Sequence, residues 1–112
     1  MLDAGVEMVL GSDAPVSPLD PWLAMAAAVH RSADDRGAWH PEHALTAQEA
    51  LAASIGEQPT VDAGSRGDLV LLDADPLADV GDSAAVAAHL RSLPVALTAV
   101  GGRVVHAGSA LE

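Results

Sequence analysis

Short apolar runs alternate with turn-forming residues along the 112-residue chain. Residues 6–10 form a mostly β-favouring run that ends in Gly-Ser-Asp, and Pro15 prevents its extension as an interior strand. The run predicts a buried strand whose carboxyl end presents the carboxylate of Asp13. In α/β folds, ligands and catalytic groups lie at the carboxyl ends of parallel strands. A Gly-Ser-Asp turn also closes many ordinary strands, so the run by itself fits a plain turn as well as a site.

A helix is predicted from about Pro21 to Ser32. Asp20 is a favourable N-cap, and Pro21 suits the first helical position because its missing N–H would be unbonded there anyway. The apolar residues that recur at helical spacing on one face are Trp22, Met25, Ala26 and Val29. The alanines between them would allow close packing, so we expect this helix to lie against a neighbour.

Two further helices are predicted. One begins at Thr46, which forms a capping box with Glu49, and runs to about Ile55. The residues that it is expected to bury are Leu51 and Ala52. A weaker helix covers residues 84–93, and the apolar residues on its common face are Val86, Leu90 and Leu93.

Strands are predicted in the second half of the chain. Residues 68–73 are the clearest case, because four apolar residues lie between two aspartates and Asp75-Pro76 ends the run. Residues 95–100 and 103–106 flank Gly101-Gly102. Two such runs around a two-residue Gly-Gly turn predict a β-hairpin.

Composition and charge exclude several classes of partner. The formal net charge is -11, and all five cations are arginines. Such a chain lacks the basic face that nucleic acids and anionic membrane surfaces require. No apolar run approaches the roughly 20 residues of a membrane span, and no basic-then-apolar leader opens the chain. The absence of cysteine excludes disulfides and thiolate metal sites and fits a reducing, cytoplasmic location.

Few residues are candidates for catalysis or metal binding. Asp13 is the first candidate, as a metal ligand or general base at a strand end. His40 and His43 are three residues apart, a spacing that suits a metal on a helix, but Pro41 lies between them at a helix start. That pattern more often marks two surface histidines at a helix start than a metal-binding pair. The isolated histidines, for which solvated or capping roles are expected, are His30, His89 and His106. A hydrolytic metal site needs three or more ligands, and the sequence shows no such set.

Four motifs in order cover most of the chain. They are residues 9–16 with 18–22, residues 39–51, residues 67–77 and residues 100–106. The first, Val-Leu-Gly-Ser-Asp-Ala-Pro-Val, resembles the end of the catalytic barrel in metal-dependent amidohydrolases, and the other three resemble the segments that follow it. The resemblance is to the YtcJ-like or formamidase-like branch of these enzymes.

The resemblance implies a function for Asp13. In that family, the aspartate after the eighth barrel strand contributes to the metal site and shuttles protons during hydrolysis. It also implies a small-molecule amide substrate, hydrolysis of carbon–nitrogen bonds other than peptide bonds, and a divalent metal, with Zn²⁺ expected in a complete barrel. The family's His-x-His strand, bridging lysine and other metal-binding histidines have no counterpart here, and Gly67 stands where alanine is common.

We therefore expect an α/β chain that forms the C-terminal portion of a (β/α)8-barrel enzyme. Residues 1–58 would hold the last barrel strand and the following helices, and residues 59–112 would hold strands of the small accessory β-sandwich domain. Because a (β/α)8 barrel takes roughly 250 residues, we expect the chain to be inactive alone. The alternatives are a non-catalytic remnant, a small α/β binding or interaction module, and a split enzyme whose barrel is another polypeptide. We expect exposed apolar surface on the side that faces the missing barrel, and it should favour self-association or binding to the missing barrel portion.

Overall fold

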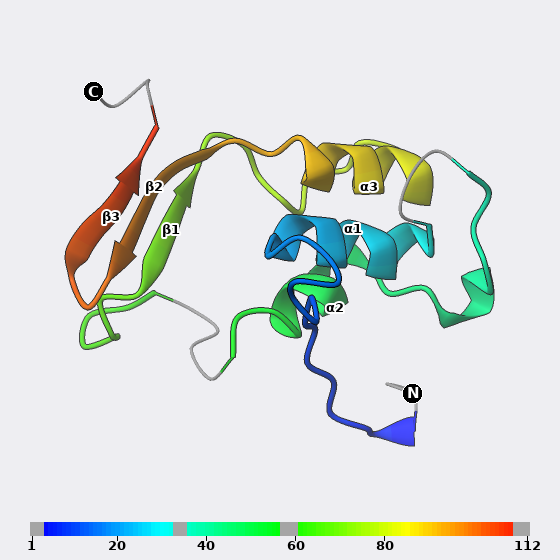
Figure 1. The fold of residues 1–112 in the computed structure, drawn as a ribbon, viewed down its shortest axis with the longest axis horizontal. Helices are drawn as coiled ribbons and strands as arrows, with labels where there is room; N and C mark the ends of the chain where they lie inside the picture. The colour runs from blue at the N-terminus through cyan, green and yellow to red at the C-terminus, as the bar shows by residue number, and fades with distance from the viewer. Residues whose placement is uncertain (1–3, 33–35, 57–60, 109–112) are drawn as a thin grey trace.

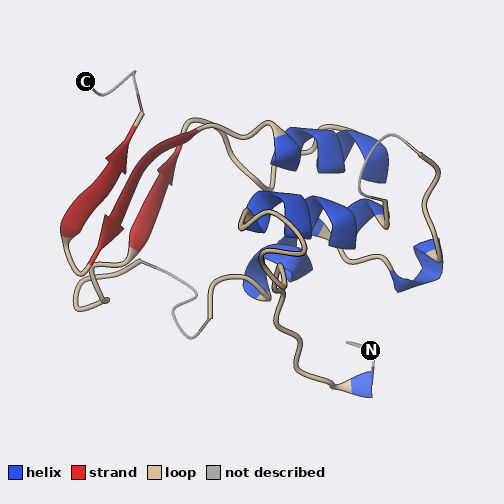
Figure 2. Cartoon of the chain, in the orientation of Figure 1, coloured by secondary structure: helices blue, strands red, loops and turns tan. Residues whose placement is uncertain are grey.

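The computed structural model describes residues 4–32, 36–56 and 61–108. In that part of the chain, a group of helices lies at one end of the molecule and an antiparallel sheet at the other (Figures 1 and 2). The elements in chain order are α1 (Pro21–His30), the 3₁₀-helix η2 (Pro41–His43), α2 (Ala47–Ala52), β1 (Leu69–Leu72), α3 (Ser83–Arg91), β2 (Val95–Val100) and β3 (Arg103–Ala107).

Helix α1 begins where the sequence predicts. The Asp20 side chain accepts a hydrogen bond from the N–H of Trp22 at 3.0 Å, and Pro21 opens the helix. The helix ends at Arg31, which adopts a left-handed conformation (φ 61°) and donates its N–H to the Ala27 carbonyl at 2.7 Å. The predicted apolar face is confirmed, since the buried residues of the helix are Met25, Ala26 and Val29.

The core lies among the helices. Helix α1 packs against both α3 and α2, and the largest fully buried side chains are Met25 and Leu90. The other buried residues of this cluster are Val29 and three alanines, namely Ala26, Ala50 and Ala87. Because an alanine removes little apolar area from water, the two long side chains contribute a large share of the hydrophobic stabilisation.

Helix α2 keeps its predicted capping box. The Thr46 hydroxyl accepts a hydrogen bond from the Glu49 N–H at 3.1 Å, and the Glu49 carboxylate accepts one from the Thr46 N–H at 2.9 Å. The predicted burial of Ala52 is wrong, because that residue lies on the solvent side of the helix. The residues that face the core are Ala50, Leu51 and Ala53.

The sheet has the strand order β1-β2-β3 and is antiparallel throughout. The predicted hairpin is confirmed: Gly101 and Gly102 join β2 to β3 with positive φ of 58° and 78°. The predicted strand over residues 68–73 is confirmed as β1, whose Leu69 pairs with Ala99 of β2. A small α/β fold is therefore present, and its strands are antiparallel.

Residues 6–10 do not form the predicted buried strand. No strand includes them, and Val9 is 78% exposed. The segment contacts the helices at its end, where the Leu10 N–H donates to the Ala53 carbonyl at 3.0 Å. A strand needs a neighbouring strand to take its backbone hydrogen bonds, and the sheet of this chain lies at the other end of the molecule (Figure 2). The (β/α)8 arrangement and the boundary at residues 58 and 59 stay predictions; that boundary lies outside the described residues.

Apolar side chains remain exposed on the sheet. All of β3 is exposed, and the exposed large apolar residues of the three strands are Val70, Leu71, Val100, Val104 and Val105. The predicted barrel-facing apolar surface and self-association stay predictions. Among the helices described, none combines the length and apolarity needed to cross a membrane.

Candidate functional site

Asp13 lies in a tight turn between the extended N-terminal segment and α1. Its backbone is left-handed (φ 53°), a conformation that aspartate tolerates better than most residues. The turn closes where the Val16 N–H donates to the Asp13 carbonyl at 2.9 Å, and the Ala14–Pro15 peptide bond within it is cis. Asp13 is exposed. The turn therefore exposes Asp13 to solvent, and no strand precedes it, so the predicted place of Asp13 at a strand end is not found.

The surroundings of Asp13 do not complete a metal centre. A carboxylate oxygen suits a divalent cation, but protein metal sites take three or more side-chain ligands. Within the described ranges, Asp13 belongs to no group of three histidine, aspartate or glutamate side chains that could hold a metal. The residues present thus supply one suitable donor and do not fit a whole site. No metal-dependent step follows from the geometry of this chain.

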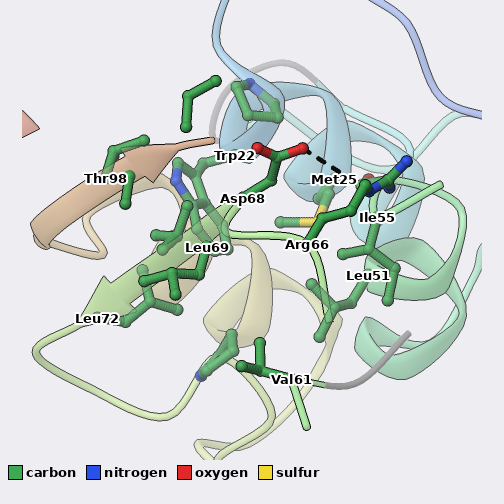
Figure 3. A pocket seen from close by; sticks show the side chains of 16 residues that line it. Trp22, Met25, Leu51, Ile55, Val61, Arg66, Asp68, Leu69, Leu72 and Thr98 are labelled. Atoms are coloured by element: carbon green, nitrogen blue, oxygen red, sulfur yellow. Dashed lines mark ion pairs between the residues drawn. The ribbon is translucent and has the colours of Figure 1, made fainter. Parts of the chain in front are cut away.

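A cavity of about 490 Å³ lies between the helices and the sheet (Figure 3). Its walls are mostly apolar, and Trp22 and Met25 of α1 face Leu69 and Leu72 of β1 across it. Volumes of this size are typical of small-molecule sites, which are also mainly apolar. The sequence contains no signal for this cavity, because the residues that line it come from segments far apart in the chain.

An ion pair forms the polar part of the cavity wall. The Arg66 guanidinium lies 3.8 Å from the Asp68 carboxylate, and both side chains are about half exposed or more. The other oxygen of Asp68 accepts a hydrogen bond from the Gly101 N–H at 2.8 Å. Asp68 therefore ties the β2–β3 turn to the start of β1, a structural function that leaves its carboxylate engaged on both sides.

A second cluster of titratable side chains lies at η2. The Nδ1 atom of His40 lies 2.8 Å from the Glu42 carboxylate, and the rings of His40 and His43 stack with centroids 5.5 Å apart. All three residues are exposed. The hydrogen bond with His40 lowers the pKa of the Glu42 carboxyl below its ordinary value of 4.5. The two histidines are visible in the sequence at a helix start, whereas Glu42 is not predicted as their partner although it lies between them.

The three isolated histidines have structural partners. His30 Nδ1 lies 3.0 Å from the Ser83 hydroxyl and so links α1 to α3. The Nε2 atoms of His89 and His106 lie 2.8 Å from the Asp75 carbonyl and 3.3 Å from the Val95 carbonyl, respectively. The structure brings none of these three together with Asp13 in a group that could hold a metal.

Comparison with known proteins decides the family. A sequence model described as "Amidohydrolase family" matches residues 1–106. The chain belongs to the amidohydrolase family. The amidohydrolase chain is also 38% identical, over 112 residues, to a curated protein named N-substituted formamide deformylase from Arthrobacter pascens. That alignment covers 91% of this chain and 20% of the relative, so the chain spans about a fifth of the relative's length. No solved structure matches this chain.

Proposed function

We propose that this chain is the C-terminal portion of a hydrolase that cleaves carbon–nitrogen bonds other than peptide bonds in small amides. The observation that carries the proposal is the family match over nearly the whole chain. The name of the relative supports N-substituted formamides as the proposed substrate class. In that reaction water adds to the formyl carbon, the carbon–nitrogen bond breaks, and the products are formate and an amine.

Asp13 is the residue of this chain that would take part in the chemistry. Its exposed carboxylate would accept a proton from the attacking water and return it to the leaving nitrogen. The same carboxylate would supply one oxygen ligand to a divalent ion, for which we propose Zn²⁺. When bound, such an ion supplies a water that ionises near neutral pH. The other ligands would come from barrel strands outside these 112 residues.

The proposed arrangement assigns residues 1–58 to the end of the barrel and residues 59–112 to the accessory β-domain. The antiparallel β1-β2-β3 sheet supports the second assignment, because its strands suit a β-sandwich. The exposed apolar side chains of the sheet support a missing neighbour. We propose that the 112 residues alone do not catalyse hydrolysis.

The deciding experiment starts from the DNA upstream of Met1. If an open reading frame continues there and encodes His-x-His and further barrel strands, the long protein and the 112-residue chain are assayed for formate release from an N-alkyl formamide with added Zn²⁺. We expect turnover by the long protein only. Asp13→Asn should lower its kcat about 10²–10⁴-fold. Asp20→Asn is the matched control, because asparagine caps a helix as well as aspartate does.

The outcomes separate the alternatives. Metal-dependent turnover by the 112-residue chain, lost in Asp13→Asn, would overturn the proposal that the rest of the barrel is needed. Full activity of the long Asp13→Asn protein would remove Asp13 from the mechanism. A true start site at Met1 with no barrel polypeptide in co-purification would favour the non-catalytic remnant, whereas a co-purified barrel would indicate a split enzyme.

A second candidate function is binding of a small apolar molecule without catalysis. The cavity between α1 and the sheet is the observation that favours it. Trp22 lines this cavity, and Trp39→Phe would leave Trp22 as the single tryptophan and hence as a fluorescence reporter. Saturable quenching by an N-alkyl formamide, lost in Leu69→Asn, would support binding there. An unchanged spectrum would argue against it.

A further inference from the structure

We propose that His40, Glu42 and His43 form a zinc-binding site on the surface of the chain. Each residue offers one ligand atom, and these atoms all lie within 4.8 Å of one another. All three side chains are exposed, so an ion can reach them without any opening of the fold. The proposal rests on this arrangement alone and does not depend on the proposed catalytic function of Asp13.

The donor set matches zinc chemistry. Two imidazoles and one carboxylate form a three-ligand set in which Zn²⁺ keeps a fourth position for water. Imidazole nitrogen also selects zinc and its transition-metal neighbours over Mg²⁺ and Ca²⁺, which prefer oxygen. Bonds of about 2.0–2.2 Å in a tetrahedron place the donor atoms about 3.3 Å apart. The three atoms must therefore close in by no more than about 1.5 Å, which rotation of exposed side chains can provide.

The turn places the two imidazoles together. In a 3₁₀-helix, residues three apart lie on the same side, because one turn takes three residues. His40 caps η2 and His43 ends it, so their rings stack with only 14° between their planes. Pro41 restricts the backbone between them. Glu42 already contacts His40, with its carboxylate 2.8 Å from the Nδ1 atom.

The cluster is anchored to α1 through Trp39. The Trp39 ring packs edge-on against His40, with centroids 4.4 Å apart. Two hydrogen bonds join Trp39 to Arg31 at the end of α1. The backbone N–H of Trp39 donates to the Arg31 carbonyl at 2.9 Å, and the Trp39 carbonyl accepts from the Arg31 Nε at 3.3 Å. The Arg31 guanidinium also lies 5.9 Å from the centre of the indole ring. These contacts limit the positions open to His40 before any ion binds.

Zinc titration of the metal-free 112-residue chain tests the site. Protein freed of metal with EDTA and then dialysed is titrated with ZnCl₂ by calorimetry, and with CoCl₂ by visible absorption, which reports tetrahedral coordination. We expect one ion per chain. Loss of even an outer partner of a metal ligand costs about 10–100-fold in affinity. His43→Gln should therefore weaken zinc binding by at least about tenfold.

Two control variants make the result specific. His89→Gln and His106→Gln each remove a histidine outside the cluster, and both variants should bind zinc as tightly as the unaltered chain. His43→Gln leaves the His40–Glu42 hydrogen bond in place, so circular dichroism should show an unchanged fold. The proposal is overturned if the unaltered chain binds no zinc, or if His43→Gln binds it with the same Kd. Because the readout is binding, failure here leaves the proposed hydrolase function standing, and the reverse also holds.

Discussion

Gly67 and Gly102 are in backbone contact although 35 positions separate them in the sequence. The Gly67 carbonyl accepts a hydrogen bond from the Gly102 N–H at 2.9 Å. A methyl group added to Gly67 would overlap the Gly102 backbone, with the Gly102 Cα only 2.8 Å away. The segment before β1 therefore packs directly against the β2–β3 turn, and the absence of a side chain at Gly67 makes this contact possible.

The first prediction concerns this contact. Gly67→Ala should lower the free energy of unfolding by about 1–3 kcal/mol, because the turn must shift to admit the new methyl group. Urea denaturation followed by circular dichroism measures the change. Gly37→Ala is the matched control, since a Cβ there meets no heavy atom within 4 Å. Equal unfolding midpoints for the two variants would show that the turn moves without lowering the free energy of unfolding.

The second prediction concerns the core. Leu90 of α3 is 1% exposed, and Leu90→Ala should lower the free energy of unfolding by about 2–5 kcal/mol through lost burial and a residual cavity. Leu19→Ala is the matched control, because Leu19 is 85% exposed, and it should change stability by less than about 0.5 kcal/mol. Thermal or urea unfolding of both variants provides the comparison. A similar loss in both would contradict a core centred on the helices.

The third prediction concerns the capping box of α2. Thr46→Ala removes the hydroxyl that accepts the Glu49 N–H and should cost about 0.5–2 kcal/mol. Thr46→Ser keeps that hydroxyl and should stay close to the unaltered chain. Amide hydrogen exchange at Glu49 shows whether the loss is local to the helix start. Unchanged exchange in Thr46→Ala would mean that packing against α1 holds the helix without its cap.

The fourth prediction concerns the ionisation of Glu42 in metal-free protein. The pKa of its carboxyl should lie below 4.5, chiefly because of the hydrogen bond with His40, and His40→Gln should raise it. His43→Gln should raise it less, since His43 acts only through its charge. Carboxyl NMR shifts followed through an acid titration give the midpoints. A larger rise in His43→Gln than in His40→Gln would contradict the geometry of the cluster.

The lowered pKa of Glu42 determines how its contribution to the stability of the fold changes with pH. A carboxyl whose pKa is depressed on folding stabilises the fold above its unfolded pKa, and that contribution disappears as the pH falls through the folded value. For Glu42 the loss therefore begins below about pH 4.5. Because the side chain is exposed, solvent screens the interaction and the effect on global stability should be small.

Much of the local structure follows from the sequence because its signals act over a few residues. Asp20-Pro21 starts α1, Thr46 caps α2 with Glu49, and the Gly101-Gly102 pair turns the hairpin. Each of these depends on hydrogen bonds or backbone angles within about one turn of chain, so no distant partner has to be known.

The candidate sites were predictable only in part. Asp13 and the His40–His43 pair are visible in the sequence, because residue type and spacing alone mark them. The proximity of Glu42 to both imidazoles depends on η2 being a 3₁₀-helix, which a pattern interrupted by Pro41 does not indicate. The cavity beside Trp22 was not predictable at all, because α1 and β1 meet only in the folded chain.

The sequence by itself determined where the helices begin, where the hairpin turns and which family the motifs resemble. The tertiary structure alone decided that residues 6–10 form no strand, because a strand exists only where another strand takes its hydrogen bonds. It also decided which alanines of α2 are buried, since that depends on how the helix is rotated against α1. Both outcomes depend on contacts between segments far apart in the chain, and local propensity carries no information about such contacts.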